Sequence, residues 1–280
     1  MRILIHGGFF SESSQSNETK SLKQKALLDI LEKSKSYLES NNAVATSIFA
    51  TSLLEDSPLF NAGIGSQIQQ DGKIRMSAAI MDGTSQKFSG VINIENVQNP
   101  VFVAQRLMKE DDRVLGGEGA TKYAAKEGFP LFSTETEERK KEYLSKKESA
   151  GTGTVGCVVL DNQGKLAAAT STGGKGFEIP GRVSDSATIA GNYANQHCAV
   201  SCTGVGEDIV SSGLATKIVT RVTDGRSLEE AFTRSFDELK PYDGFAGAIG
   251  VSKDGDVFFS ESHPKIVYAS FDGKNNTVFI

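Results

Sequence analysis

The spacing of apolar and polar positions along the chain predicts six helices. Apolar side chains recur at helical intervals in the segments 20–38, 43–54, 100–109, 117–126, 208–223 and 228–239. Asn41-Asn42 and Asn99-Pro100 precede two of these segments and are typical of helix starts. Ser227 and Glu230 form the spacing of a capping box before the last one.

Short β-prone runs predict strands between and after these helices. They lie at 2–5, 66–70, 73–81, 88–94, 155–161, 165–171, 188–193 and 198–202, with three more near Ala248, Val257 and Val267. Gly7-Gly8 is expected to end the first strand. Asp71-Gly72 predicts a hairpin turn between the second and third, and residues 162–164 predict the turn of another hairpin.

A run of charge separates the two halves of the chain. Ten of the fourteen residues from 135 to 148 are charged, five of each sign. The run is either a solvated helix stabilised by pairs four residues apart or a flexible connector. Strands and helices do not alternate regularly, which disfavours a doubly wound parallel sheet. Helices and antiparallel hairpins instead group by region, which predicts an α+β fold divided at the connector.

Composition narrows the class of protein. The chain has 280 residues, 38% hydrophobic and 23% charged, as expected of a soluble globular protein. Its net charge of −5 argues against nucleic acid as a partner. The start MRILIHGG is too short an apolar run for a signal peptide, and no segment suits a membrane span, so we expect a cytoplasmic protein. Cys157, Cys198 and Cys202 match no metal or disulfide pattern and are expected in the core.

Candidate chemistry concentrates after the connector. The glycine-rich stretch at 116–119 lacks the context of a phosphate loop, and three scattered histidines do not suggest a zinc site or a usual histidine triad. What remains is a group of Thr, Gly, Arg and Asp residues in the segments GTGTVGCVVLD, ATSTGG, GRVSDS and CTGVGE.

These segments resemble the plant-type asparaginase and isoaspartyl peptidase family of N-terminal-nucleophile hydrolases. The opening HGG, PLFNAGIGS at 58–66, MDG at 81–83 and GEGA at 117–120 follow in the family's order, so the resemblance spans nearly the whole chain. Local departures fall around the substrate pocket: HGGFF for HGGAG, GRVSDS for GRVGDS, AGNYA for GAG-x-YA, and Phe245-Ala246-Gly247 for a Gly-Gly pair.

Chemistry supports a threonine nucleophile independently. A Thr hydroxyl needs a base, and with no suitable histidine the simplest base is the α-amine of the same residue, whose reference pKa is about 7.7–8.0. The chain must then be cut before that Thr, and a preceding Gly gives the backbone the necessary freedom. Both Gly151-Thr152 and Gly153-Thr154 satisfy this. The hairpin that begins at Val155 and the family pattern favour Thr154.

The resemblance implies roles for the residues around this nucleophile. Thr172 would orient the Thr154 hydroxyl, and Thr203 with Gly204 would form the oxyanion hole. Asn61 and Gly7 would lie near Thr154.

By the same resemblance, three residues would bind the substrate. Arg182 would bind an α-carboxylate, Asp185 an α-ammonium, and Gly206 would contribute its carbonyl. The plainer alternative for Arg182 and Asp185 is a mutual surface salt bridge. The segment 54–64 resembles a stabilising loop in which main-chain oxygens hold sodium, here those of Leu54, Glu55, Ser57, Phe60, Ala62 and Ile64. Apart from that possible structural ion, no cofactor is expected.

The resemblance implies a four-layer αββα sandwich cut into two subunits that together form one structural domain. The α-subunit would be 1–153, with the connector at about 134–153, and the β-subunit 154–280. Two such heterodimers would associate. The expected reaction is hydrolysis of the β-amide of L-asparagine and of isoaspartyl dipeptides. Alternatives are a glycosylasparaginase-like amidase, a taspase-like protease, and an unprocessed protein without activity.

Overall fold

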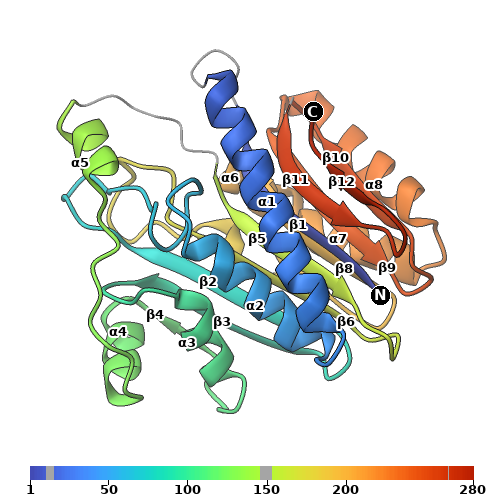
Figure 1. The fold of residues 1–280 in the computed structure, drawn as a ribbon, viewed down its shortest axis with the longest axis horizontal. Helices are drawn as coiled ribbons and strands as arrows, with labels where there is room; N and C mark the ends of the chain where they lie inside the picture. Colours follow the sequence, from blue (N-terminus) through green and yellow to red (C-terminus); the bar gives the residue numbers. More distant parts are fainter. Residues whose placement is uncertain (11–15, 146–152, 264) are drawn as a thin grey trace.

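The computed structural model describes residues 1–10, 16–145, 153–263 and 265–280. Within these ranges the strands form two sheets (Figure 1). The eight-stranded sheet has the order β12 (Asn276–Val278), β11 (Ile266–Phe271), β1 (Arg2–Phe9), β5 (Val155–Leu160), β6 (Leu166–Thr172), β2 (Met76–Asp82), β3 (Lys87–Ile94) and β4 (Val114–Gly116). The four-stranded sheet has the order β10 (Val257–Glu261), β9 (Ala246–Ser252), β8 (Cys198–Gly204) and β7 (Asn192–Ala194).

The strands before and after the charged run are interleaved in the larger sheet. β5 pairs antiparallel with β1 on one side and β6 on the other, and Gly7 lies opposite Val155. β6 then pairs with β2. The expected division of the fold at the connector is therefore wrong at the level of the sheet, because hydrogen bonding joins strands from both halves.

Helices cover the outer sides of the two sheets. α1 (Asn17–Leu38) packs on β11 and β1, and α2 (Ala43–Glu55) packs on β5 and β6. α7 (Leu214–Thr223) packs on β8, and α8 (Leu228–Asp237) packs on β10. Strands β8 and β9 contact β1, β5 and β6, so the two sheets face one another. The remaining helices are α3 (Pro100–Leu107), α4 (Gly117–Lys126), α5 (Glu137–Leu144), α6 (Gly206–Ser212) and the short 3-10 turns η1 (Asp185–Ala187) and η2 (Lys240–Tyr242).

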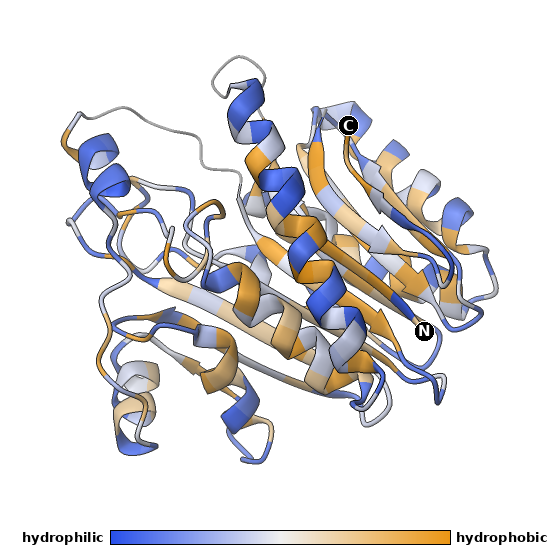
Figure 2. Cartoon of the chain, in the orientation of Figure 1, coloured by the Kyte–Doolittle hydropathy of each residue, from blue (hydrophilic) through white to orange (hydrophobic). Residues whose placement is uncertain are grey.

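Burial explains the apolar character of the central strands. Every residue of β5 and β6 is buried, because a helix lies on one face and the second sheet on the other. Figure 2 shows these strands as largely hydrophobic, whereas α5 is hydrophilic along its length. The three cysteines are buried and unpaired, as predicted. In the described part of the chain no helix is long and apolar enough to cross a membrane.

Several sequence predictions are confirmed at residue level. Asn42 accepts a hydrogen bond from the Ala45 N–H at 2.9 Å, and Ser227 with Glu230 forms the capping box. Pro100 occupies the start of α3. The charged run forms helix α5 at residues 137–144; the part at 146–148 lies outside the described residues.

Other local predictions are wrong because tertiary contacts override the pattern. The segment 66–70 is not a strand: the Gln70 N–H donates to Glu178 and the Phe177 N–H to Ile68, so the segment pairs irregularly with a distant loop. The first strand continues past Gly7-Gly8 to Phe9, since β5 and β11 flank it.

Local turns explain two further differences between the predicted and the observed elements. The helix expected at 208–223 breaks at Gly213, whose left-handed φ of 59° ends α6. The strand expected at 188–193 begins only at Asn192, because the Gly191 and Asn192 N–H groups both donate to Thr188 in a local turn. The C-terminal region has four strands, β9 to β12, rather than three.

Candidate active site

A cavity of about 850 Å³ opens where the loop after β6 meets the junction of β8 and α6. Its lining includes Thr154, Thr172, Arg182, Asp185, Gly204 and Gly206. These six residues come from four segments of the sequence. They meet because β5 and β6 are neighbours in one sheet and β8 of the other sheet packs against both. Most of the residues predicted for the site therefore share one cavity.

Thr154 lies immediately before β5 and is only 6% exposed. Its hydroxyl donates to Thr172 Oγ1 at 3.4 Å and is 3.4 Å from the Ser186 Oγ. Thr172 also accepts from the Gly174 N–H at 3.2 Å. The Thr154 hydroxyl is thus held by side-chain oxygens and not by a histidine.

Asn61 and Gly7 lie outside the cavity lining but close to the junction before Thr154. Asn61 donates from Nδ2 to the Gly174 carbonyl at 2.5 Å. A Cβ on Gly153 would lie 2.7 Å from the Asn61 Cβ, and a Cβ on Gly7 would lie 2.5 Å from the Phe60 ring. The surroundings of Gly153 and of Gly7 are therefore packed too closely for either residue to carry a side chain. The alternative junction at Gly151-Thr152 lies outside the described residues.

Gly204 ends β8 with a φ of 134°, a conformation that suits glycine. A Cβ there would lie 2.5 Å from the Phe245 carbonyl oxygen. The preceding Thr203 is fully buried, and its hydroxyl has no hydrogen-bond partner among the described residues. Thr203 itself does not line the cavity, whereas Gly204 does.

Arg182 binds a carboxylate that the sequence analysis did not assign. Its Nε and Nη2 donate to the two oxygens of Glu207 at 2.8 and 2.9 Å, a bidentate pair. This pairing lowers the pKa of Glu207 to about 2. The alternative of a mutual salt bridge with Asp185 is not found among the ion pairs of the described residues.

Asp185 is a buried carboxyl group at the start of η1. Burial raises its pKa to about 7, and nearby Arg182 opposes that rise. A Cβ on Gly206 would lie 2.7 Å from Arg182 Nη2 and 2.9 Å from Asp185 Oδ1, so both groups converge on Gly206. An ammonium group placed here would offset the burial of the Asp185 carboxylate.

A buried polar network stands behind Thr154. His6 Nε2 lies 2.8 Å from Ser201 Oγ, which lies 2.7 Å from Thr170 Oγ1; Thr170 in turn donates to Asn192 Oδ1 at 3.0 Å. Burial lowers the pKa of His6 to about 3, opposed by the Thr154 main chain, so the ring is neutral near pH 7. The network links the start of β5 to the second sheet.

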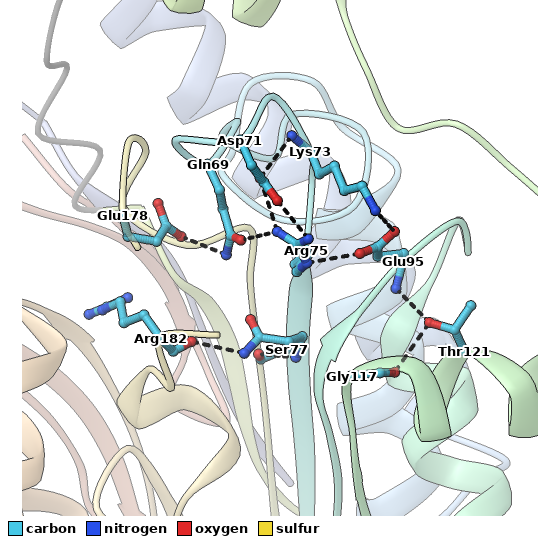
Figure 3. A network of polar contacts seen from close by, with 11 residues as sticks. Gln69, Asp71, Lys73, Arg75, Ser77, Glu95, Gly117, Thr121, Glu178 and Arg182 are labelled. Atoms are coloured by element: carbon cyan, nitrogen blue, oxygen red, sulfur yellow. Dashed lines mark hydrogen bonds and ion pairs between the residues drawn. The ribbon is translucent and has the colours of Figure 1, made fainter. Parts of the chain in front are cut away.

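Figure 3 shows the polar contacts that hold the cavity wall. Gln69 lies between Glu178 and Arg75, with contacts of 3.4 Å and 2.5 Å. Arg75 also pairs with Asp71 and Glu95, each at 2.8 Å. The Arg182 carbonyl accepts from Asn93 Nδ2 at 3.0 Å. The loop that carries Glu178 and Arg182 is therefore anchored to β2 and β3.

The segment expected to hold sodium forms a closed turn after α2. The Ile64 N–H donates to the Glu55 carbonyl at 2.7 Å, and the Phe60 N–H to the Ser57 carbonyl at 3.3 Å. Leu54, Phe60 and Ala62 are buried. The carbonyl groups of Leu54, Glu55 and Ser57 accept N–H groups within this turn.

Sequence reasoning missed Ser186, Glu207, Glu178 and the network of His6. Ser186 and Glu207 close the motifs GRVSDS and CTGVGE, so their position carried a signal. His6 opens the HGG motif, so its position also carried a signal, whereas Glu178 carried none because its importance depends on burial and on distant contacts.

The chain belongs to the asparaginase family, whose profile it matches over residues 1–280. It is 42% identical over 293 residues to the isoaspartyl peptidase/L-asparaginase of a Nostoc species, covering 98% of this chain and 92% of that protein. It is 36% identical to the isoaspartyl peptidase of Escherichia coli, covering 91% and 88%. It is 38% identical to the plant-type L-asparaginase of Pyrococcus furiosus, covering 79% and 80%.

Proposed function

We propose that this protein is a hydrolase that cleaves the β-amide of L-asparagine and of isoaspartyl dipeptides. The observation that carries the proposal is the placement of the buried Thr154 hydroxyl in one cavity with Arg182 and Asp185. The named activities of the relatives support the same substrates.

Before the first turnover, cleavage of the Gly153–Thr154 bond frees the α-amine of Thr154. That amine removes the proton of the Thr154 hydroxyl, and the oxygen attacks the side-chain carbonyl carbon of the substrate. The amine then returns the proton to the leaving ammonia or amino acid. A water molecule hydrolyses the aspartyl ester and restores the Thr154 hydroxyl.

Two groups stabilise the negative charge that develops on the carbonyl oxygen. The Thr203 hydroxyl and the Gly204 N–H act as donors, a side chain with a main-chain group. The absence of a described partner for the buried Thr203 hydroxyl supports this role. Thr172 orients the Thr154 hydroxyl, consistent with their 3.4 Å contact, and Asn61 and Gly7 shape the junction.

The head group of the substrate binds beside Gly206. Its α-carboxylate pairs with Arg182, which Glu207 holds in place, and its α-ammonium pairs with Asp185 and the Gly206 carbonyl. Only a substrate with both groups free on one carbon satisfies this arrangement. The scissile amide is therefore the one on the side chain, and the leaving group carries no such constraint.

The fold proposed for this chemistry is a four-layer αββα sandwich, supported by the helices that pack outside the two facing sheets. We propose an α-subunit of 1–153 and a β-subunit of 154–280. Two heterodimers would associate through an apolar groove where Ile189 and Val210 are 50% and 46% exposed. The carbonyls of the 54–64 turn would hold sodium, which steadies the turn and takes no part in the reaction.

The test uses purified protein and three substrates. A denaturing gel and N-terminal sequencing should show a second chain that begins Thr-Val-Gly-Cys. The mature protein should cleave L-asparagine and β-Asp-Leu but not α-Asp-Leu, whose α-carboxylate is tied up in the peptide bond. A chain that stays intact and inactive would favour an unprocessed binding protein. Comparable cleavage of α-Asp-Leu and β-Asp-Leu would refute the head-group assignment.

A further inference from the structure

Glu178 is a carboxyl group in the wall of the cavity that the reaction above does not use. Its side chain is only 4% exposed, yet it lines the cavity with Thr154. One oxygen accepts from Gln69 Nε2 at 3.4 Å, a long contact with a neutral group. The other oxygen has no hydrogen-bond partner among the described residues. A buried carboxyl group with so few partners is destabilising unless a ligand completes its contacts.

The cations around the cavity form their ion pairs with other carboxylates, and Arg182 acts on Glu178 only by charge at longer range. Lys175 and Arg182 both form their ion pairs with Glu207, at 3.5 and 2.8 Å. Glu178 forms none within the part of the chain that the structure describes. Arg75 is linked to it only through Gln69 and is already paired with Asp71 and Glu95 (Figure 3).

Glu178 and the head-group residues contact different glycines of the cavity. Arg182 and Asp185 converge on Gly206. Glu178 instead packs against Gly174, whose N–H donates to Thr172 at 3.2 Å. Thr172 contacts the Thr154 hydroxyl. With the head group at Gly206 and the scissile carbon at Thr154, the leaving group extends toward Gly174 and Glu178.

The size of the cavity fits a leaving group larger than ammonia. Its volume of about 850 Å³ is near the upper end of the ~300–1,000 Å³ typical of pockets for small ligands. Asparagine fills a small part of that space. An isoaspartyl dipeptide would extend its second residue along the wall that carries Glu178.

We propose that Glu178 forms a leaving-group subsite that favours isoaspartyl dipeptides whose second residue has a cationic side chain. The inference rests on the proposed function. An aspartyl head group brings one ammonium, which Asp185 binds. A lysine-like or arginine-like side chain brings a second cation, which completes the contacts of the Glu178 carboxyl group. An acidic second residue places a like charge there and is disfavoured.

The experiment compares kcat/KM of the mature enzyme for β-Asp-Lys, β-Asp-norleucine and β-Asp-Glu. Norleucine matches the lysine side chain without its ammonium. We expect β-Asp-Lys to exceed β-Asp-norleucine by about tenfold or more, as for a charge-assisted hydrogen bond, and β-Asp-Glu to be lowest. In Glu178→Gln the lysine-to-norleucine ratio should fall to about one, because the neutral amide offers no net Coulomb attraction.

Glu207→Gln is the matched control, since it removes the same charge from the same cavity. It should weaken both substrates through Arg182 and leave the ratio as in the wild type. If Glu178→Gln does not mature, the ratio of the wild type is measured from about 20 mM to about 0.5 M salt, where screening should reduce it.

Equal wild-type values for the lysine and norleucine substrates, or a ratio that survives in Glu178→Gln, would overturn the subsite. A wild-type ratio that rises with salt would overturn it as well. Failure to cleave any of the three dipeptides would instead refute the isoaspartyl peptidase function and the subsite with it.

Discussion

Asp185 should make substrate binding depend on pH near neutrality. Burial raises the pKa of this carboxyl group to about 7, whereas binding of an α-ammonium requires the ionised form. With that pKa, about one tenth of the free enzyme is ionised at about pH 6 and about nine tenths at about pH 8. KM for L-asparagine should therefore rise roughly tenfold on acidification across this range.

The Thr154 α-amine titrates in a similar range, so the assay must separate the two groups. Initial rates at several pH values give kcat and KM independently. Loss of the free amine lowers kcat, whereas protonation of Asp185 in the free enzyme raises KM. Asp185→Asn should bind substrate weakly at every pH and lose the KM dependence. A KM that stays flat in the wild type, or a dependence that persists in Asp185→Asn, would refute the assignment.

Thermal unfolding provides a second readout of the same group. Because the folded-state pKa of Asp185 is raised, the folded state binds more protons than the unfolded state between about pH 4 and about pH 7. The contribution of this residue to stability therefore declines as pH rises through that window. The difference in Tm between Asp185→Asn and the wild type should shift in favour of the variant as pH rises. A difference independent of pH would contradict the buried, pKa-shifted state.

Four further predictions concern the nucleophile and its surroundings. Thr154→Ala should remain one chain of 29.9 kDa on a denaturing gel, since the same hydroxyl performs the cut; two fragments would identify another nucleophile. Arg182→Ala should raise KM for L-asparagine about 10- to 100-fold, because it removes a charged hydrogen bond worth ~1.5–3 kcal/mol. An unchanged KM would show that Arg182 only pairs with Glu207 and does not bind the substrate. His6→Ala should lower kcat more than it raises KM, because the ring supports the main chain of Thr154, and His6→Asn should recover part of kcat; no recovery would argue against that support. Replacing sodium with choline in the buffer should lower Tm, and an equal Tm would remove sodium from the proposal.

The family was accessible from local sequence, and so was the placement of Thr154, the proposed nucleophile, before a strand. Gly153-Thr154 followed by a β-prone run places a Thr at the start of a buried strand, and the structure has Val155–Leu160 there. The glycines that permit close approach, such as Gly204, are visible as motif positions. Helix starts at Asn42 and Ser227 also followed from the sequence, since caps act over three or four residues.

The positions of the other site residues depended on contacts between segments that are distant in the sequence. Glu207 holds Arg182, and Ser186 meets the Thr154 hydroxyl, only because η1 lies against β6 and α6 lies against η1. The turn expected at Asp71-Gly72 forms, since the Gln69 N–H donates to the Lys73 carbonyl at 2.9 Å, but the arm before it bonds to the loop that carries Glu178 and the hairpin has no strand ladder.

Sequence alone determined the features that arise within a few residues: caps, turns and apolar strands. Tertiary structure alone decided which polar groups are buried, and therefore which carry shifted pKa values or lack partners. Burial depends on the packing of the whole chain, so a local sequence pattern does not reveal it. Glu178 and Glu238 illustrate this, because they are the same residue type in very different surroundings. The first lies in a cavity wall at 4% exposure and forms no ion pair with the described residues, whereas the second binds Lys217 and Arg221 at the surface.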